Sequence, residues 1–231
     1  LHNINRQQPR VRLFETGLRF IPGDSGLQQV PTLAMVCTGQ RFAESWTDPG
    51  EQVGFFDLKG DLESLLALTG RPEHYACEAV LRPVLHPGQS ARLTRKGQVA
   101  GFIGALHPAV GVELGLNAPV FLCEVDLAML LVGKVPEFKE LSKFPEIRRD
   151  IAVVVDDFVS AARMMEDVRM AAVTYRTDLT LFDVYTGKGI DPKRKSLALG
   201  LTFRDQSRTL GDEDVNLAVG QVLDLLEKKY N

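Results

Sequence analysis

Four cations, a tyrosine and a serine lie close together in one stretch near the end of the chain, LFDVYTGKGIDPKRKSLALGLTF (181–203). The cations occupy the loop between two strand-like runs and are Lys188, Lys193, Arg194 and Lys195. Tyr185 comes just before this loop and Ser196 just after it. An aromatic ring can stack an unpaired base while neighbouring cations hold phosphates, and each stacked base contributes ~1–3 kcal/mol to binding. The stretch therefore predicts a contact with unpaired nucleic acid.

The same residues also fit a structural interpretation, in which the loop charge is simply solvated and Tyr185 packs as an ordinary strand aromatic. Charge alone favours this alternative slightly, because the chain has a formal net charge of -3. From Lys139 onward, 15 Lys and Arg stand against 16 Asp and Glu, a net of -1. A generally basic nucleic-acid binder is therefore excluded. The cations are local, and four further arginines are expected to extend them: Arg148, Arg149, Arg204 and Arg208.

No catalytic or metal-binding constellation is predicted. His86 and His107 each stand directly before a proline, and no nucleophile or second ligand accompanies either of them. The three cysteines are far apart, form no CxxC pair and have apolar neighbours, which predicts buried thiols in a reducing compartment and no zinc site. These cysteines are Cys37, Cys77 and Cys123.

The length and composition indicate two domains. The chain has 231 residues, 45% hydrophobic and 25% charged, and no run approaches the ~20 apolar residues of a membrane span. Its start resembles no signal peptide, so a fragment of a longer chain is expected. The stretch GKVPEFKELSKFPEIRR (133–149) holds two prolines and alternating charge, as connectors do. We place a boundary there, between domains 1–138 and 139–231.

The first domain is expected to be an antiparallel or mixed sheet with a few helices. Its predicted strands are 10–22, 32–39, a hairpin over 90–107 that turns at Lys96-Gly97, and 119–127. Its predicted helices are 57–71 and 108–116. Asp57, Asp61 and Glu63 gather at the start of the first helix, where the helix dipole favours carboxylates, so we assign them a structural role.

The second domain reads as β-α-β-β-α, the ferredoxin-like split βαβ pattern without its last strand. The predicted elements are strand 148–157, helix 160–172 capped by Ser160, strands 178–187 and 195–205, and helix 209–230. The last helix is expected to start with a Thr209–Asp212 capping box and to place Leu217, Leu223 and Leu226 on or near one face.

The strand that follows the basic loop predicts which face of this sheet is open. Its large apolar residues alternate with small ones, and only the large ones are worth burying against the helices. The large set is Leu197, Leu199, Leu201 and Phe203; the small set is Ser196, Ala198, Gly200 and Thr202. The small set leaves a flat surface that admits a nucleotide base or another domain.

FPEIRRDIAVVVDD, LFDVYTGKG and KSLALGLTFRDQSRTL together resemble the anticodon-binding ferredoxin-like domain that ends the beta chain of bacterial phenylalanine–tRNA ligases. RVRLFETGLRF, FFDLKGDLESLL, LHPGQSA and GFIGALHP resemble the preceding domain of that beta chain, a class II synthetase-like core that has lost catalysis. The fold class implied is α+β throughout. The resemblance covers essentially the whole chain, which would be roughly the last third of the beta chain.

The resemblance implies residue roles. The family tyrosine that stacks on an anticodon base matches Tyr185, and a serine that contacts an anticodon base matches Ser196. Lys195, Arg148 and Arg149 lie in matching motifs, and we infer their RNA contact from charge. The glycine-rich stretch of a class II catalytic site ends in an arginine, which GFIGALHPAV lacks, so an ATP clamp is missing and no adenylate is expected here.

The implied partners are tRNA, a catalytic alpha chain and the rest of the beta chain in a cytoplasmic alpha2-beta2 assembly, with neither DNA nor membrane. ATP and magnesium would serve the full complex, and no cofactor or metal is expected in this segment. An alternative is a ferredoxin-like regulatory or dimerisation module that binds a small molecule. The turn DDFVSA (156–161) lacks the glycine such a pocket uses, which argues mildly against it.

Overall fold

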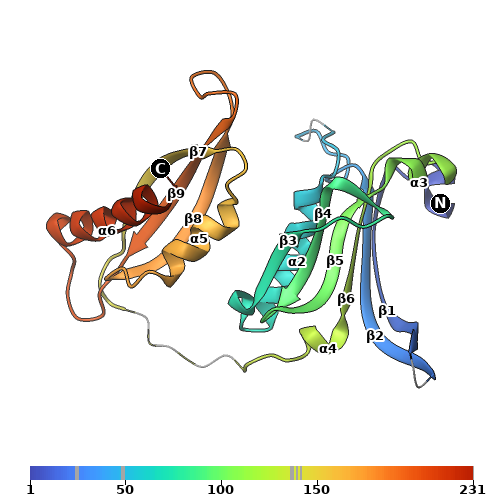
Figure 1. Ribbon diagram of the computed structural model, residues 1–231, viewed down its shortest axis with the longest axis horizontal. Coiled ribbons are helices and arrows are strands. Elements are labelled where there is room, and N and C mark those ends of the chain that lie inside the picture. The colour runs from blue at the N-terminus through green and yellow to red at the C-terminus, as the bar shows by residue number, and fades with distance from the viewer. Residues whose placement is uncertain (24–25, 48–49, 136–137, 139, 141, 231) are drawn as a thin grey trace. The chain divides into compact units, whose positions relative to one another are not determined.

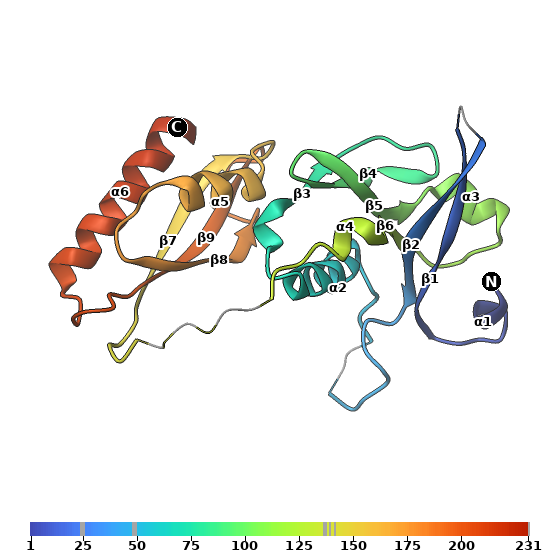
Figure 2. The ribbon, with the colours of Figure 1, turned by 90° about the horizontal axis from the view of Figure 1, so that it is seen from below.

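The structure, a computed structural model, describes residues 1–230 apart from 24–25, 48–49, 136–137, 139 and 141. The chain divides into two compact units, Leu1–Glu137 and Phe138–Asn231, which Figure 1 and Figure 2 show from two sides. The boundary expected between 138 and 139 involves Lys139, which lies outside the described residues, so the domain limits stay a prediction. In the described part of the chain, no helix is both long and apolar enough to cross a membrane.

The first unit is built on a six-stranded sheet in the order β1-β2-β6-β5-β4-β3, and every neighbouring pair is antiparallel. The strands are β1 (Arg10–Gly23), β2 (Gly26–Gly39), β3 (Tyr75–Ala79), β4 (Leu85–Arg95), β5 (Gln98–Leu106) and β6 (Val120–Asp126). The helices are α1 (His2–Asn5), α2 (Phe55–Leu68), the 3₁₀ turn η1 (Pro72–His74), α3 (Pro108–Glu113) and α4 (Leu127–Leu130). Of the two expected arrangements, antiparallel or mixed, the sheet has the antiparallel one, and it contains a strand that was not predicted, β3.

The core of this unit lies between α2 and the sheet. Leu58, Leu62 and Leu66 of α2 are buried in one cluster with strand residues such as Leu93 and Ile103. The stripe has the i, i+4, i+8 spacing of an amphipathic helix. The helical periodicity read from the leucines therefore positions α2 correctly, although the helix begins two residues earlier than expected.

The carboxylates at the start of α2 are structural, as predicted. Asp57 accepts hydrogen bonds from the Gly54 backbone N–H at 2.7 Å and from Arg41 Nε at 2.6 Å. Asp61 pairs with Arg12 of β1, and Glu63 with Lys59 one turn away on α2. These contacts fix the start of α2 and tie it to the edge of the sheet. They leave no carboxylate pair arranged for acid–base chemistry.

The prediction of buried thiols is confirmed for Cys37 and Cys123, whereas Cys77 is only partly buried. All three thiols are free. Burial raises the pKa of Cys37 to about 11 and that of Cys123 to about 12, so neither forms the reactive thiolate at neutral pH. Among the described residues, no group of three or more His, Cys, Asp or Glu is placed to hold a metal ion.

The second unit has the β-α-β-β-α order predicted for a ferredoxin-like domain. Its elements are β7 (Ile147–Asp156), α5 (Ala161–Met170), β8 (Arg176–Tyr185), β9 (Arg194–Phe203) and α6 (Asp212–Tyr230). The sheet is antiparallel in the order β7-β9-β8. The Ser160 hydroxyl accepts from the Arg163 backbone N–H at 3.4 Å, which confirms its cap on α5.

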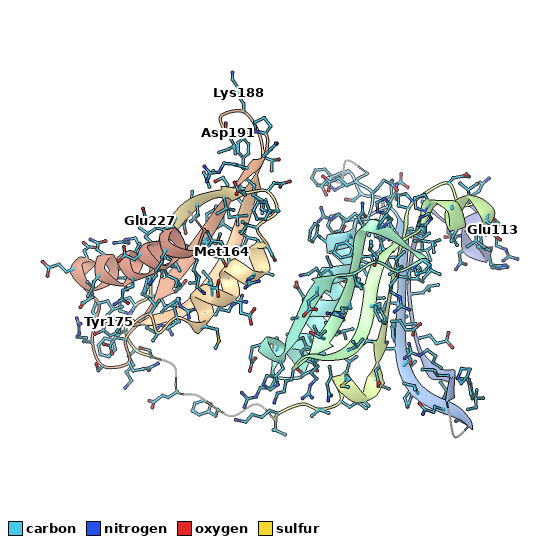
Figure 3. All side chains as sticks on the ribbon, in the orientation of Figure 1. Glu113, Met164, Tyr175, Lys188, Asp191 and Glu227 are labelled. Atoms are coloured by element: carbon cyan, nitrogen blue, oxygen red, sulfur yellow. The ribbon has the colours of Figure 1, made fainter. Side chains whose placement is uncertain are left out.

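The alternation in β9 sets the two faces of this sheet. Its large apolar residues are fully buried against α5 and α6, together with Met164, which Figure 3 shows on α5. These strand residues are Leu197, Leu199, Leu201 and Phe203. Within the described residues of the second unit, no element covers the opposite face, where β9 presents Ser196, Ala198, Gly200 and Thr202 between β7 and β8. We call this surface the open face.

The predicted face of α6 is confirmed for Leu226 and wrong for Leu217 and Leu223. Leu217 and Leu223 are 70% and 43% exposed, whereas the buried stripe is Val215, Ala218, Val222 and Leu226. Small and β-branched side chains let the helix approach the leucines of the sheet closely, so the larger leucines turn outward. The predicted cap is wrong as well: the Gly211 backbone N–H donates to the Asp214 carboxylate at 3.0 Å, one turn into a helix that begins at Asp212.

Candidate nucleic-acid interface

The basic loop between β8 and β9 extends beyond the end of the sheet. Lys188 and Asp191 lie at its tip in Figure 3. Two turns shape it, in which the Ile190 N–H donates to the Gly187 carbonyl at 3.2 Å and the Arg194 N–H to the Asp191 carbonyl at 2.8 Å. The side chains of Lys188 and Lys193 are exposed, and within the described residues neither makes a hydrogen bond or ion pair. Both are available to an anion.

Tyr185 and Ser196 stand directly opposite each other where β8 and β9 meet the loop. Val154 of β7 flanks Ser196 on its other side, so the three residues form one row across the open face. Opposed residues of an antiparallel pair have Cβ atoms ~5 Å apart. The structure thus brings together the two residues that the sequence singled out, although they are eleven positions apart.

The Tyr185 ring is held by the loop itself. Its hydroxyl donates to the Lys188 carbonyl at 3.2 Å. Its ring packs on Gly187, where an added Cβ would stand 2.3 Å from the hydroxyl oxygen and 2.4 Å from Cζ. Gly187 therefore has to lack a side chain, a requirement that sequence reasoning missed. Tyr185 as a whole remains 45% exposed, which leaves area for a stacked base.

Arg194 and Lys195 differ from the two lysines because their donors are engaged. Arg194 Nη2 donates to the Val154 carbonyl at 2.9 Å, and Lys195 Nζ to the Asp157 carbonyl at 2.6 Å. Both side chains are partly buried. They fix the base of the loop against the end of β7, and their charge still contributes to the local positive field.

The neighbouring Arg148 and Arg149 are separated by the pleat of β7. Arg148 lies on the open face, where Nε donates to Asp150 at 2.8 Å and the guanidinium stands 5.3 Å from the centroid of the Phe182 ring. Arg149 lies toward the helices, and its Nη2 donates to Asp212 at the start of α6 at 2.6 Å. RNA contact by Arg149 stays a prediction, and it lies off the open face.

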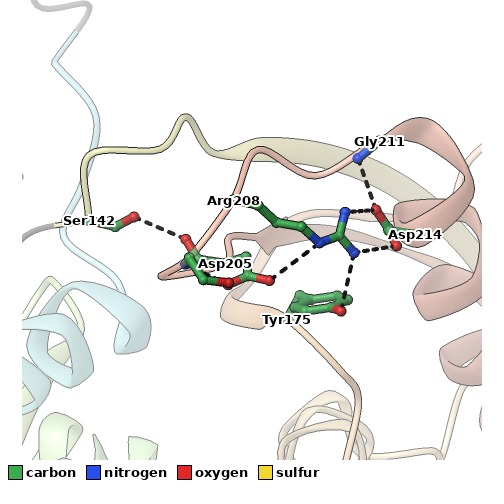
Figure 4. Close-up of polar contacts among 7 residues, drawn as sticks. Ser142, Tyr175, Asp205, Arg208, Gly211 and Asp214 are labelled. Atoms are coloured by element: carbon green, nitrogen blue, oxygen red, sulfur yellow. Dashed lines mark hydrogen bonds and ion pairs between the residues drawn. The ribbon is translucent and has the colours of Figure 1, made fainter.

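The suggestion that Arg148, Arg149, Arg204 and Arg208 extend the cation group of the loop is wrong. Arg148 and Arg149 are paired with Thr202 and Leu201, near the end of β9 that is far from the loop. Arg204 pairs with Glu146, and Arg208 donates to both oxygens of Asp214 at 2.7 and 2.8 Å (Figure 4). Arg208 also donates to the Tyr175 hydroxyl at 3.4 Å. Arg204 and Arg208 follow β9, whereas the basic loop precedes it, so they anchor the opposite end of the sheet.

Comparison with known proteins gives two matches that divide the chain. A family model described as "Phenylalanyl tRNA synthetase beta chain CLM domain" matches residues 1–127, and one described as "Ferredoxin-fold anticodon binding domain" matches residues 142–231. Among individual proteins, the chain is 49% identical over 230 residues to the phenylalanine–tRNA ligase beta subunit of Pseudomonas syringae pv. tomato. Identity to the corresponding subunits of Pasteurella multocida and Shewanella oneidensis is 45% and 43%. All of this chain is covered, and it spans 29% of the length of each of these relatives.

Proposed function

The chain belongs to the phenylalanyl-tRNA synthetase beta chain family, and from this premise we propose that it is a non-catalytic segment of a phenylalanine–tRNA ligase. It supplies recognition of the tRNA anticodon and contacts to other subunits, while the complex charges tRNA with phenylalanine at the expense of ATP in the cytoplasm. The observation that carries the proposal is the row formed by Tyr185 and Ser196 on an open ferredoxin-fold sheet, beside a loop with two unengaged lysines.

In this proposal the Tyr185 ring stacks one unpaired anticodon base. The Ser196 hydroxyl, which can both donate and accept, reads the edge of that base from the opposite strand. Lys188 and Lys193 hold phosphates, and Arg194 and Lys195 keep the loop in place. One stacked base contributes ~1–3 kcal/mol to binding, and a few charge contacts add to it. Such a modest total is what we expect of a domain that is one part of a larger tRNA-binding assembly.

The contacts of the first unit support its non-catalytic role. Arg12 and Arg19, which lie in the stretch RVRLFETGLRF that resembles the synthetase-like core, pair with Asp61 and Glu124 and are not free for ATP phosphates. The glycines of GFIGALHP serve packing: a Cβ at Gly101 would stand 2.2 Å from the Glu124 carbonyl oxygen of β6. ATP and magnesium therefore belong to other parts of the proposed complex, which we take to be an alpha2-beta2 assembly with catalytic alpha chains.

Exposed apolar side chains on β1 support a contact with other parts of that assembly. Phe14, Leu18 and Phe20 share one face of β1 and are 78%, 52% and 53% exposed, and Leu13 on the opposite face is 54% exposed. Grouped apolar side chains of this size on a surface typically mark an interaction site. We propose that β1 faces the alpha chain or the rest of the beta chain. For the second unit, the match to the anticodon-binding family model favours anticodon recognition over a small-molecule regulatory module.

The test is a fluorescence-anisotropy titration of a labelled phenylalanine-tRNA anticodon stem-loop with the 231-residue chain at two salt concentrations. We expect binding that weakens with salt, and a loss of about 5- to 150-fold in affinity for Tyr185→Ala, the equivalent of one stacked base. A stem-loop with a changed anticodon serves as the control. An affinity that is unchanged both by the altered anticodon and by Tyr185→Ala would overturn the proposal.

A further inference from the structure

A second planar group lies on the open face, away from the row of Tyr185. The guanidinium of Arg148 lies over Gly200 of β9, where an added Cβ would stand 2.7 Å from Nη2 and 3.0 Å from Cζ. The same guanidinium is 5.3 Å from the centroid of the Phe182 ring of β8. Arg148 comes from β7, so its side chain reaches across the strand next to it toward β8.

This guanidinium is held in place before any ligand arrives. Its Nε donates to the Asp150 carboxylate at 2.8 Å, two positions along the same strand. Asp150 is in register with Gly200, so the carboxylate that accepts from Arg148 and the glycine beneath the guanidinium lie in one row across the sheet. The Arg148 side chain nevertheless stays 55% exposed, and Phe182 is 49% exposed. A plane that is fixed beforehand loses little conformational entropy when a ligand stacks on it.

We propose that Arg148, positioned by Gly200, Asp150 and Phe182, is a second base-stacking plane of the open face. It takes the base of a nucleotide next to the one on Tyr185. Arginine guanidinium planes stack unpaired bases through cation–π and dispersion contacts, and this stacking tolerates any base. The proposal rests on the proposed function and adds to it a site of low base specificity.

The spacing of the two planes defines the form of the ligand. Gly200, which lies under the Arg148 guanidinium, is four residues along β9 from Ser196 in the row of Tyr185, about 13 Å at the rise of a strand. Stacked bases follow each other at 3.4 Å along a nucleic-acid strand. Adjacent nucleotides therefore reach both planes only when they are unstacked and extended. A single-stranded loop meets this requirement, and a duplex does not.

The decisive variant is Gly200→Ala, because the three atoms nearest to its Cβ would all belong to the Arg148 side chain. We expect it to keep the thermal stability of the parent chain and to lose about 5- to 150-fold in affinity for the anticodon stem-loop, the same loss as Arg148→Ala. The double variant should lose no more than either single one. Arg148→Lys, which keeps the charge without the plane, should bind as weakly as Arg148→Ala. Arg163→Ala on α5, on the helix side of the sheet, is the charge-matched control and should bind like the parent chain.

Stem-loops with one abasic residue at a time then locate the base. With one abasic position, Arg148→Ala should cause no further loss of affinity. With a different abasic position, Tyr185→Ala should cause no further loss. Full affinity in Gly200→Ala, or in Arg148→Lys, would overturn the second plane. In that event a loss confined to Tyr185→Ala would leave the proposed function intact. Failure of the parent chain to bind any stem-loop would overturn the proposed function together with this inference.

Discussion

Replacing Gly187 by alanine should displace the Tyr185 ring without touching the tyrosine itself. The added Cβ would lie 2.3 Å from the hydroxyl oxygen, 2.4 Å from Cζ and 2.7 Å from Cε2. All three distances are shorter than any real carbon contact, and they involve the stiff ring plane, so the whole ring has to turn away. The backbone of Gly187 is not in the left-handed conformation, so alanine adds no backbone strain there.

The magnitude follows from what the ring does in the proposed function. Losing one stacked base costs ~1–3 kcal/mol, a drop of about 5- to 150-fold in affinity. Tyr185→Phe keeps the ring and loses only the intramolecular hydrogen bond to the Lys188 carbonyl, which contributes ~0.5–1.5 kcal/mol to the stability of the loop, so its affinity for RNA should fall by no more than that amount. The expected order of affinity is therefore parent chain, Tyr185→Phe, then Gly187→Ala and Tyr185→Ala together.

The assay is the anisotropy titration of the anticodon stem-loop, with thermal unfolding of each variant measured alongside. Gly220→Ala on α6 is the matched control, because its Cβ would meet no atom within 4 Å, and it should bind like the parent chain. If Gly187→Ala binds as tightly as the parent chain while Tyr185→Ala does not, the ring position given by the structure is not the one that binds RNA. That result would refute the reasoning.

Two further predictions concern charge. The double variant Lys188→Ala/Lys193→Ala should lower the slope of log affinity against log salt by roughly 1.4, about 0.7 for each single-strand phosphate contact, and an unchanged slope relative to Lys228→Ala would count against these contacts. The paired Arg208 and the Gly211 N–H lower the pKa of Asp214 to about 2, below its ordinary 3.8. A carboxyl with a lowered pKa stabilises the fold above its ordinary pKa and loses that contribution as the pH falls toward about 2. Denaturant unfolding at pH 6, 4, 3 and 2.5 should therefore show the gap between the parent chain and Asp214→Asn closing below pH 4; a constant gap would contradict the ion pair.

The order of elements in the second unit could be predicted because strong signals coincide there. Alternation in KSLALGLTF fixes both the strand and its buried face, and Ser160 marks the start of α5. The sequence also identified Tyr185 and Ser196, because each flanks the loop directly. Antiparallel pairing then had to bring them together, once β8 and β9 formed one hairpin.

Other features could not be predicted because they depend on neighbours across the sheet. The strand β3 has only five residues, and the signal in YACEA is too short to separate from a loop. The core stripe of α6 depends on how close the helix lies to the sheet, which favoured Val and Ala over the larger Leu217 and Leu223. Gly187 and Gly200 look like ordinary loop and strand glycines. Their role appears only when the side chains packed against them are placed.

The distribution of carboxylates on the open face argues for a defined orientation of the RNA. β7 and β8 expose Asp150, Asp156, Asp178 and Asp183 on or beside this face, whereas the unengaged cations Lys188 and Lys193 are on the loop. Phosphates are repelled from the middle of the sheet and attracted to the loop. Bases, which carry no charge, are free to turn toward Tyr185 and the Arg148 plane. On the proposed function, the RNA backbone therefore follows the loop with its bases directed onto the sheet, and stacking rather than net charge supplies most of the affinity that this domain contributes.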